Sequence, residues 1–499
     1  MSKRTVSGIM FTLLLIGMLM LAFNVRLVEA GTITVPDDYP TIQEAINAAN
    51  LGDTVYVRNG TYYENVVVNK RVALFGENKN TTVIVGVAYS PVWEPVINVR
   101  ADDVKIANLT VTNGGHGIQL FSGKRNIVTD CVSYGNGFGL SISESSQNFL
   151  RRNIIFNNSH NLLVHGSWCI DHFIQDIDPS NLVDGKPVYY LVNEENLSIN
   201  PVTFPNVGYL AVVNSNNVQI ANLSLSRNGN GLLIAFSPNT LIENVEATHN
   251  FYAISLMCSP GTMVKHCNFS YNFCGIFLCY SDHVNIQENN ISHNEEGIVL
   301  MCSNYGAVYH NNFIENYRYY QARVDESHNV HWDDGYPSGG NYWSDHVCTG
   351  NPSDGSQPYI IDANNTDHYP FQDPNGWLLH QLTVTSSPIT GITFTINENP
   401  QTTPYTEWLL EGSYTLIMPE THNGYVWSHW LEDGDTNRIK TITLPGTTYT
   451  AVYTEPPVGG YSFPIKGYTT TKPLTIYLAI VAILTASFAI VKRRKKQQS

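Results

Sequence analysis

The chain has 499 residues, of which 43% are hydrophobic and 14% are charged, and its formal net charge is −15 at pH 7. This length is enough for a large repeat domain and a smaller second domain. The acidic balance argues against a nucleic-acid partner, because nucleic-acid binding needs clustered basic residues.

Both ends of the chain carry apolar segments. Residues 1–30 combine a basic start, an apolar stretch and a small-residue cleavage site, which predicts a secretory signal peptide. Residues 473–491 are uncharged and long enough to cross a bilayer as a helix, and the basic tail 492–499 follows them. Since basic residues stay on the cytoplasmic side, we expect a single-pass membrane protein with an extracellular bulk and a cytoplasmic tail.

A short cap opens the predicted extracellular part. Residues 40–49 contain Thr41 with Glu44 three positions later, which is the pattern of a capping-box helix. We expect this helix to cover the first turn of the repeat domain that follows, over residues 31–375, because an open end would expose strand edges.

A 22-residue repeat organises the middle of the chain. Its glycine-type positions are Gly117, Gly139, Asn161, Gly231, Ala253, Gly275, Gly297 and Tyr319. Asparagine recurs three residues before these positions, and alternating apolar residues flank them, which indicates short strands with one buried face. Three such strands per repeat predict an all-β fold, a parallel β-helix. We expect the recurring asparagine to be the left-handed turn residue, with its amide stacked between rungs.

The repeat is interrupted between Asn161 and Gly231. Residues 166–208 keep strand-like runs but lose the period, so we expect rungs that carry an inserted loop. The loop and the rung before it supply the candidate catalytic residues. These are Asp176, Asp178, Asp184 and Arg152. The alternative interpretation, which we favour, is a solvated acidic loop.

Residues 329–371 are rich in glycine, aspartate, proline and aromatic residues and have no period, so we expect them to cap the far end of the β-helix. Its aromatic residues are candidates for stacking on sugar rings. They are Trp332, Tyr336, Tyr342 and Trp343. We favour the alternative that they close the apolar end of the solenoid.

The pattern changes again after the cap. Isolated alternating strands over residues 380–454 predict a small β-sandwich of the immunoglobulin-like or surface-repeat type. The proline- and glycine-containing residues 455–472 then form a predicted linker to the membrane.

The eight cysteines invite a disulfide interpretation, which the register tests. Cys258 and Cys302 occupy one column two rungs apart, or about 9.6 Å, which is too far for a bridge. Cys131 and Cys267 share a column with apolar residues, so we expect them to be small core residues.

A soft-metal site is the sharper alternative for the sulfur-containing residues. Met257, Cys279 and Met301 stack in one outward column, and Cys274 and His266 lie in the same rungs. Thiolate and thioether ligands select Cu(I). The competing interpretation is that this ladder packs against the insertion or the second domain.

Polysaccharide cleavage needs paired carboxylates at a defined separation. The outward columns show no acidic cluster on adjacent rungs. They contain Gln119, Ser141, Leu163, Ser255 and Val299.

Asn-x-Ser/Thr sequons are frequent, and in a secreted protein they are candidates for glycosylation. They begin at Asn59, Asn80, Asn108, Asn157, Asn196, Asn222, Asn268, Asn290 and Asn364.

Three stretches carry a family resemblance. They are residues 39–62, the motif Asp-Gly-Lys-Pro-Val-Tyr-Tyr at 184–190, and Trp-Asp-Asp-Gly-Tyr-Pro-Ser-Gly-Gly-Asn-Tyr-Trp-Ser-Asp at 332–345 with Asp-His-Tyr-Pro at 367–370. They resemble the NosD-like periplasmic copper-binding family, which is grouped with pectin-lyase-like carbohydrate-binding proteins and sugar hydrolases. The resemblance implies a right-handed parallel β-helix and copper or calcium as a cofactor. The family's acidic run is replaced here by residues 351–355, which counts against calcium. The whole arrangement looks like an archaeal cell-surface protein.

These observations predict a membrane-anchored extracellular β-helix protein. We expect it to bind a cell-surface or environmental polysaccharide, or envelope proteins, without catalysis. One alternative is a polysaccharide lyase or glycoside hydrolase of the pectin-lyase-like fold. The other is a copper-binding protein that uses Met and Cys ligands.

Overall fold

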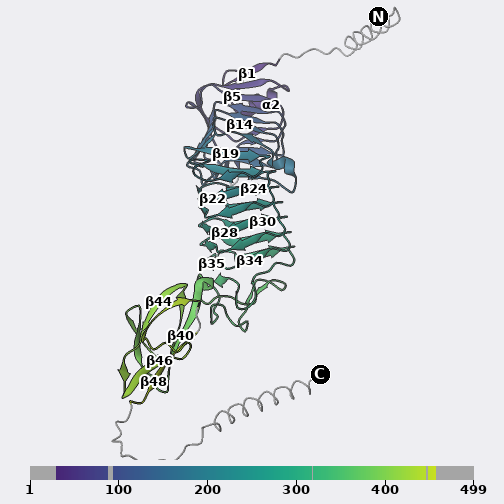
Figure 1. Ribbon diagram of the computed structural model, residues 1–499. Helices are drawn as coiled ribbons and strands as arrows, with labels where there is room; N and C mark the ends of the chain where they lie inside the picture. Colours follow the sequence, from purple (N-terminus) through teal and green to yellow (C-terminus); the bar gives the residue numbers. More distant parts are fainter. Residues whose placement is uncertain (1–29, 88–93, 317, 446–447, 457–499) are drawn as a thin grey trace, which may run out of the picture. The chain divides into compact units, whose positions relative to one another are not determined.

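The computed structural model describes residues 30–87, 94–316, 318–445 and 448–456 (Figure 1). The predicted signal peptide, apart from residue 30, most of the linker, the membrane segment and the basic tail lie outside the described residues. The described part is almost entirely β-structure, and its strands confirm the predicted parallel β-solenoid. Within these ranges, no helix is long and apolar enough to cross a membrane. The described chain divides into two compact units, with the solenoid in the first.

The N-terminal cap contains the predicted helix. Helix α2 (Ile42–Ala48) begins after Thr41, whose side chain accepts a hydrogen bond from the backbone N–H of Glu44 at 3.1 Å. Ile42 and Ile46 are fully buried against the first strands. The helix therefore covers the apolar end of the first rung.

Parallel sheets form the faces of the first half of the solenoid. The first face is β1 (Thr32–Val35), β2 (Thr54–Val57), β5 (Ala73–Gly76), β8 (Lys105–Ala107), β11 (Ile127–Thr129), β14 (Phe149–Arg151) and β17 (Asp176–Ile177). The second is β3 (Gly60–Tyr63), β6 (Thr82–Val85), β9 (Thr110–Thr112), β12 (Val132–Tyr134), β15 (Ile154–Phe156) and β18 (Leu182–Val183). The third is β4 (Val66–Val68), β7 (Pro95–Val99), β10 (His116–Phe121), β13 (Phe138–Ser143) and β16 (His160–His165). A 3-10 turn, η1 (Ile170–Phe173), follows β16.

The strand direction reverses at one hairpin. β18 pairs antiparallel with β19 (Lys186–Val192), across a turn in which Asp184 has φ 47° and Gly185 has φ 79°. Positive φ at both positions is the geometry of a type I′ turn, which Asp-Gly favours. β19 then pairs in parallel with β21 (Tyr209–Val213). The shared 13-stranded sheet therefore consists of two parallel blocks that run in opposite directions.

The second half continues this sheet and adds two further faces. The continuation is β24 (Asn230–Ala235), β27 (Tyr252–Met257), β30 (Cys274–Cys279), β33 (Glu296–Met301) and β36 (Tyr320–Asp325). One new face is β20 (Ser198–Ile199), β22 (Gln219–Ala221), β25 (Leu241–Glu243), β28 (Met263–Lys265), β31 (Asn285–Gln287) and β34 (Ala307–Tyr309). The other is β23 (Ser224–Ser226), β26 (Glu246–Thr248), β29 (Asn268–Ser270), β32 (Asn290–Ser292), β35 (Asn312–Ile314) and β37 (Tyr342–Trp343).

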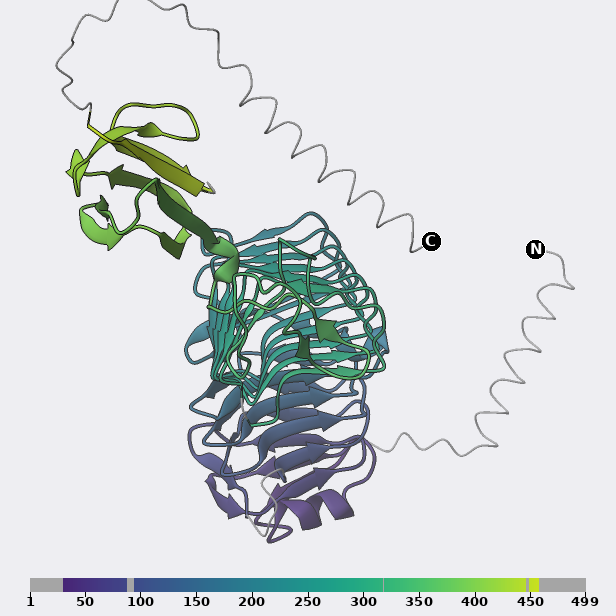
Figure 2. The ribbon, with the colours of Figure 1, turned by 90° about the horizontal axis from the view of Figure 1, so that it is seen from below.

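The two halves bury opposite faces of the shared sheet. Val183 and, after the hairpin, Val188 and Leu233 belong to the core of the first half. Leu210 and Leu232 belong to a separate core in the second half. Successive strand residues point to opposite sides of a sheet, so the second half lies across the sheet from the first. The offset between the early and the later rungs is visible in Figure 2.

The first half also covers part of the outer face of the second. The backbone N–H of Gly229 donates to the carbonyl of Leu162 at 2.8 Å, and that of Val164 donates to Oδ1 of Asn230 at 3.0 Å. These bonds place the middle of β16 beside the start of β24.

Two indoles close the far end of the solenoid. Trp332 and Trp343 are each 1% exposed. Trp343 stacks on Phe313 with ring centroids 4.3 Å apart, and its Nε1 donates to Oδ2 of Asp367 at 2.9 Å. Burial raises the pKa of Asp367 to about 7, against the effect of its hydrogen-bond donors. A two-stranded sheet of β38 (Tyr359–Ile360) and β39 (Thr366–Asp367) and a 3-10 turn, η2 (Gly376–Leu378), complete this region.

Residues 379–454 form two sheets. One is β43 (Tyr405–Leu410), β40 (Leu379–Ser387), β48 (Thr448–Thr454), β46 (Tyr425–Trp430) and β45 (Thr421–His422). The other is β42 (Asn399–Thr402), β41 (Thr393–Ile396), β44 (Gly412–Ile417) and β47 (Ile439–Leu444). Phe394, Trp430 and Tyr453 are buried here. The boundaries of a sandwich domain at 380 and 454 stay a prediction.

Candidate functional site

An aromatic groove runs along one corner of the second half. It has a volume of about 760 Å³ and follows the turns that precede β27, β30, β33 and β36, with the start of β16 on its other side. We define the aromatic groove by its lining residues. They are Ser159, His160, His249, Asn250, Phe251, Tyr271, Asn272, Phe273, His293, Glu295, Arg318 and Tyr319.

A ladder of buried asparagines supports this corner. The backbone N–H of Asn250 donates to Oδ1 of Asn272 at 2.8 Å, and that of Asn272 donates to Oδ1 of Asn294 at 2.9 Å. The side-chain amide of each also donates to the oxygen of the next, at 3.1 and 2.9 Å. The predicted stacking of asparagine amides between rungs is confirmed.

The left-handed position of the turn is one residue earlier than predicted. His249, Tyr271 and His293 have φ of 57–58°, whereas the asparagine that follows each of them is absent from the positive-φ residues. The physical reason is that each asparagine must point its side chain inward, where its Oδ1 accepts a hydrogen bond from the backbone N–H of the neighbouring rung. The residue before it takes the left-handed conformation and points outward, at a cost for a residue with a β-carbon.

The outward residues stack into two rows. In the first row, Tyr271 lies between His249 and His293, with ring centroids 5.6 and 5.0 Å apart. In the second, Phe251 and Phe273 stack at 4.5 Å with their planes 4° apart. Tyr271 is 57% exposed. The repeat therefore builds a regular platform of rings that is open to solvent.

The groove has little net charge. Glu295 and Arg318 form an ion pair with Oε1 and Nη1 2.6 Å apart. His160 stacks on Phe138 at 5.0 Å, and burial lowers its pKa to about 4, which leaves it uncharged at neutral pH. His293 lies beside Glu315, with 3.0 Å between Nε2 and Oε2.

The outer face of the last rungs holds a charged cluster that the sequence patterns missed. Arg323 Nη1 lies 3.0 Å from Glu296 Oε1, and Arg323 Nε lies 3.2 Å from Asp325 Oδ2. Burial raises the pKa of Glu296, while Arg323 opposes that shift. The cluster joins β33 to β36 and lies next in sequence to Glu295 of the groove.

A two-residue shift hid this cluster. Glu296 pairs with Tyr320, and Ile298 pairs with Ala322. The last strand therefore begins two residues later than the 22-residue period predicts, and the repeat position assigned to Tyr319 was wrong. The asparagine ladder keeps the period, since Asn294 donates to Asn316 at 3.0 Å, and the extra residues lie between that asparagine and β36.

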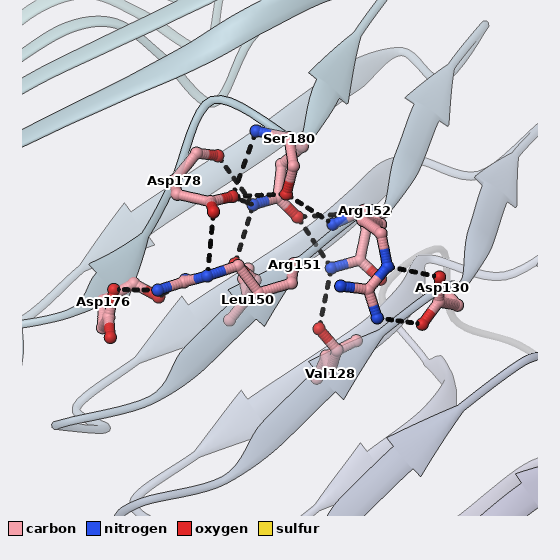
Figure 3. Close-up of polar contacts among 10 residues, drawn as sticks. Val128, Asp130, Leu150, Arg151, Arg152, Asp176, Asp178 and Ser180 are labelled. Carbon is pink, nitrogen blue, oxygen red and sulfur yellow. Dashed lines mark hydrogen bonds and ion pairs between the residues drawn. The ribbon is translucent and has the colours of Figure 1, made fainter.

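Two of the three predicted catalytic carboxylates, Asp176 and Asp178, are engaged in ion pairs. Arg151 lies between Asp176 at 2.5 Å and Asp178 at 2.9 Å, while Arg152 turns away to Asp130 at 2.7 Å (Figure 3). Asp184 occupies the hairpin turn and accepts hydrogen bonds from Asn157 and Asn161. The structure thus brings Asp176 and Asp178 together, but around an arginine, and it separates both from Arg152.

The predicted sugar-stacking residues of the C-terminal cap fall into two groups. Trp332 and Trp343 are buried, so neither ring face is free to stack on a sugar. This corrects their assignment as ligand-binding residues and favours the alternative that they close the solenoid. Tyr342 is partly buried, and Tyr336 is 64% exposed and contacts Tyr369 at 6.0 Å.

The sulfur column has the predicted register. Met257 pairs with Cys279, and Cys279 pairs with Met301. Met257 is only 3% exposed, and the other two are partly buried against the first-half core with Leu233 and Phe277. The column therefore packs as the competing interpretation expects.

The donor set at this column does not fit copper. Met257 is almost fully buried, and burial raises the pKa of the Cys279 thiol to about 11, so metal binding here would have to displace a strongly held proton at a covered site. Cys274 lies five residues away along β30, about 17 Å, and its thiol donates to the carbonyl of Ile276. His266 follows β28 on another face and lies 3.0 Å from Glu288. In the described ranges, no group of three or more His, Cys, Asp or Glu residues is arranged to hold a metal ion.

All eight cysteines are free in the structure. Cys131 and Cys267 are buried, as predicted for small core residues, whereas Cys169 in the loop after β16 is exposed. Near the C-terminal cap, Asp354 of the 351–355 segment accepts hydrogen bonds from Ser356 rather than joining a cluster of carboxylates.

The glycosylation candidates stay predictions. Most of these asparagines are exposed, and Asn108 and Asn290 are half-buried. Exposure is necessary for modification but does not demonstrate it.

Comparison with known proteins gives one family match. The family model of the periplasmic copper-binding protein (NosD) matches residues 46–172 and 174–348. No curated protein matches the chain.

Solved structures with a similar course of the chain include three carbohydrate-active enzymes. The A-module of mannuronan C-5 epimerase AlgE6 from Azotobacter vinelandii is 14% identical, covers 57% of this chain and 93% of its own, and has a TM-score of 0.25. Alginate lyase from Paenibacillus sp. is 13% identical, with 60% and 99% coverage and a TM-score of 0.28. Polygalacturonase from Erwinia carotovora is 11% identical, with 62% and 98% coverage and a TM-score of 0.27. Likeness at this level does not extend to activity or substrate. The family match spans more than half of the chain, and the chain therefore belongs to the NosD family.

Proposed function

We propose that this protein is a non-catalytic, carbohydrate-binding β-helix protein of the cell envelope, and that the aromatic groove is its binding site. The observation that carries the proposal is the pair of stacked ring rows, one over three successive rungs and the other over two. Pyranose rings have apolar C–H faces that pack on aromatic rings, and their hydroxyl edges need nearby polar partners. The groove supplies both, and its volume lies in the range of ordinary ligand sites.

The shape of the groove supports a polymer rather than a small molecule. Its rings repeat at the rung spacing, with neighbouring centroids 4.5–5.6 Å apart. A polysaccharide can contact several rings at once, and each contact can be weak. The exposed Tyr271 and Tyr319 are the strongest candidates for direct contact.

The small number of carboxylates in the described lining of the groove supports a non-catalytic role. Among the described lining residues, Glu295 alone has a carboxylate, and Arg318 binds it. Glycoside hydrolysis requires two carboxylates in distinct roles. A polysaccharide lyase or hydrolase remains the second candidate. Glu296 and Asp325 favour it, since they place two carboxylates on adjacent rungs.

The sequence patterns and the family support a location outside the cytoplasm. The NosD family is described as periplasmic, which agrees with a chain whose bulk lies outside the cytoplasm. Export by residues 1–30 and anchoring by residues 473–491 complete the proposal.

Binding to immobilised glycans tests this proposal. We expect Tyr271→Ala and Tyr319→Ala to reduce glycan affinity about ten-fold each, which corresponds to the loss of about 1.4 kcal/mol of apolar contact with one ring. Tyr134→Ala is the matched control, because Tyr134 stacks on Phe156 at 5.5 Å outside the groove. Equal losses in all three variants, or no binding by the parent protein to any glycan, would exclude the groove as the site.

A further inference from the structure

The charges that line the aromatic groove cancel each other. Glu295 and Arg318 come from adjacent rungs, with 2.6 Å between Oε1 and Nη1. The half-buried imidazole of His160 is uncharged at neutral pH, because burial lowers its pKa to about 4. The described lining therefore presents no unpaired cation.

The surroundings of the groove have more carboxylates than cations, although the exposed Arg227 continues the first ring row one rung before His249. Arg323 is shared between Glu296 and Asp325, so this cluster has one more carboxylate than guanidinium groups. Glu315 lies beside His293 at the groove edge. The chain as a whole has a net charge of −15. An anionic ligand would approach against this field.

We propose that the groove selects uncharged glycans and rejects uronate-containing or sulfated ones, and that Glu295 sets this selectivity by neutralising Arg318. The inference deepens the proposed carbohydrate-binding function and rests on it. A carboxylate of the ligand would have to displace Glu295 from Arg318, which would leave Glu295 without its cation inside the groove. An unpaired charge of this kind is unfavourable, and specificity arises from that unfavourable contact with the wrong ligand.

The geometry allows the selectivity to be reversed by one substitution. The side chain of Arg318 is 65% exposed, against 32% for Glu295. Glu295→Gln keeps the size of the side chain but removes its charge, which leaves Arg318 free to bind a ligand carboxylate. Glu243→Gln is the matched control. Glu243 pairs with Lys265 at 3.0 Å on the face of β25 and β28, outside the groove, and its replacement changes the net charge equally.

The experiment measures affinity for a neutral glucan, a neutral mannan, polygalacturonate and alginate. It uses the full chain in detergent at pH 8, where histidine side chains are generally uncharged. Each titration is run at low ionic strength and again at about 0.15 M salt, because salt screens exposed charges. The parent protein should bind a neutral glycan with little salt dependence and should bind the two polyuronates at least about ten-fold more weakly at low salt.

For Glu295→Gln, we expect the ratio of polyuronate to neutral-glycan affinity to rise about three-fold or more at low salt, and the rise to shrink at high salt. Glu243→Gln should leave this ratio unchanged. Tighter binding of polyuronate than of neutral glycans by the parent protein overturns the inference, as does an equal rise in both variants. Absence of binding to all four glycans instead contradicts the proposed function itself, so the two failures are distinguishable.

Discussion

The two ends of strands β27, β30 and β33 present different chemistry on the same scaffold. At their N-terminal ends, the turns expose stacked rings that include Tyr271. At their C-terminal ends, Met257, Cys279 and Met301 form a column that packs into a core. Both ends repeat with the same register, and both have bulky residues in left-handed turns, Tyr271 at one and Tyr280 at the other.

The two ends differ in how far their side chains are exposed to solvent. The ring end borders a groove of about 760 Å³, whereas the sulfur end is largely covered by apolar neighbours. Regular stacking of ligand-like side chains is thus a property of the repeat and does not by itself indicate a site. A site also needs an open face, and this separates the carbohydrate proposal from the copper hypothesis.

The largest expected effect comes from the asparagine ladder below the rings. Asn272→Leu would leave the buried N–H and amide of Asn250 without their acceptor, at a cost of about 3 kcal/mol or more. We expect a lower urea midpoint and loss of glycan binding. Ser281→Ala, which removes one acceptor from the ladder at the sulfur end, should cost about 1 kcal/mol and keep binding. Similar effects of the two variants on binding would contradict the distinction between the ends.

The left-handed tyrosines at the two ends allow a matched comparison. Asparagine tolerates this conformation, so Tyr271→Asn and Tyr280→Asn should each change stability by no more than about 1 kcal/mol. Only Tyr271→Asn should weaken glycan binding, by about ten-fold. Thermal unfolding and glycan titration of both proteins provide the measurement, and a loss of binding in Tyr280→Asn would argue for a ligand site at the sulfur end.

The acid stability of the protein should report on His160. Its pKa is about 4 in the folded protein, against an ordinary histidine value of 6.5 that we take for the unfolded chain. Between these values the unfolded chain binds a proton that the folded chain does not, so stability should fall as the pH decreases from about 6.5 to about 4. His160→Phe should flatten this part of the profile of melting temperature against pH. An unchanged slope would show that His160 is not the responsible group.

The smallest effect concerns thiol reactivity. With its thiol pKa raised to about 11 and its side chain half covered, Cys279 should react slowly with iodoacetamide at pH 8, and exposed Cys169 should react first. Peptide mass spectrometry after timed labelling gives the order. Rapid labelling of Cys279 would mean an accessible thiolate and would reopen the question of metal binding.

Much of the solenoid was predictable because its repeat is local. The asparagine and apolar columns, the stacking of Met257, Cys279 and Met301, and the burial of Cys131 and Cys267 all follow from one period and from strand alternation. The aromatic groove was not predicted, because His249, Tyr271 and His293 occupy a position normally associated with asparagine or glycine. Sequence preference alone therefore pointed to the wrong turn residue.

Two departures from the 22-residue period account for the other differences between the prediction and the structure. The extra residues before β36 moved Arg323 from the column of Met301 to that of Val299, and placed Asp325 in the column of Met301. Asp184 and Gly185 were visible in the sequence as part of a family motif. The reversal of strand direction at this turn, however, depends on which strands pair on either side of it. That information is not contained in a 22-residue pattern.

The hairpin at Asp184 and Gly185 also gives the solenoid a centre from which it can grow. In a repeat protein each rung contacts mainly its neighbours, so folding can start at one point and spread from rung to rung. Here a two-residue loop joins β18 to β19, and a short closed loop has a small entropic cost. Rungs can then be added in both directions from this hairpin, toward helix α2 on one side and toward Trp332 and Trp343 on the other. Because Leu233 and Phe277 of the second half pack in the core of the first half, that core is complete only after growth in both directions.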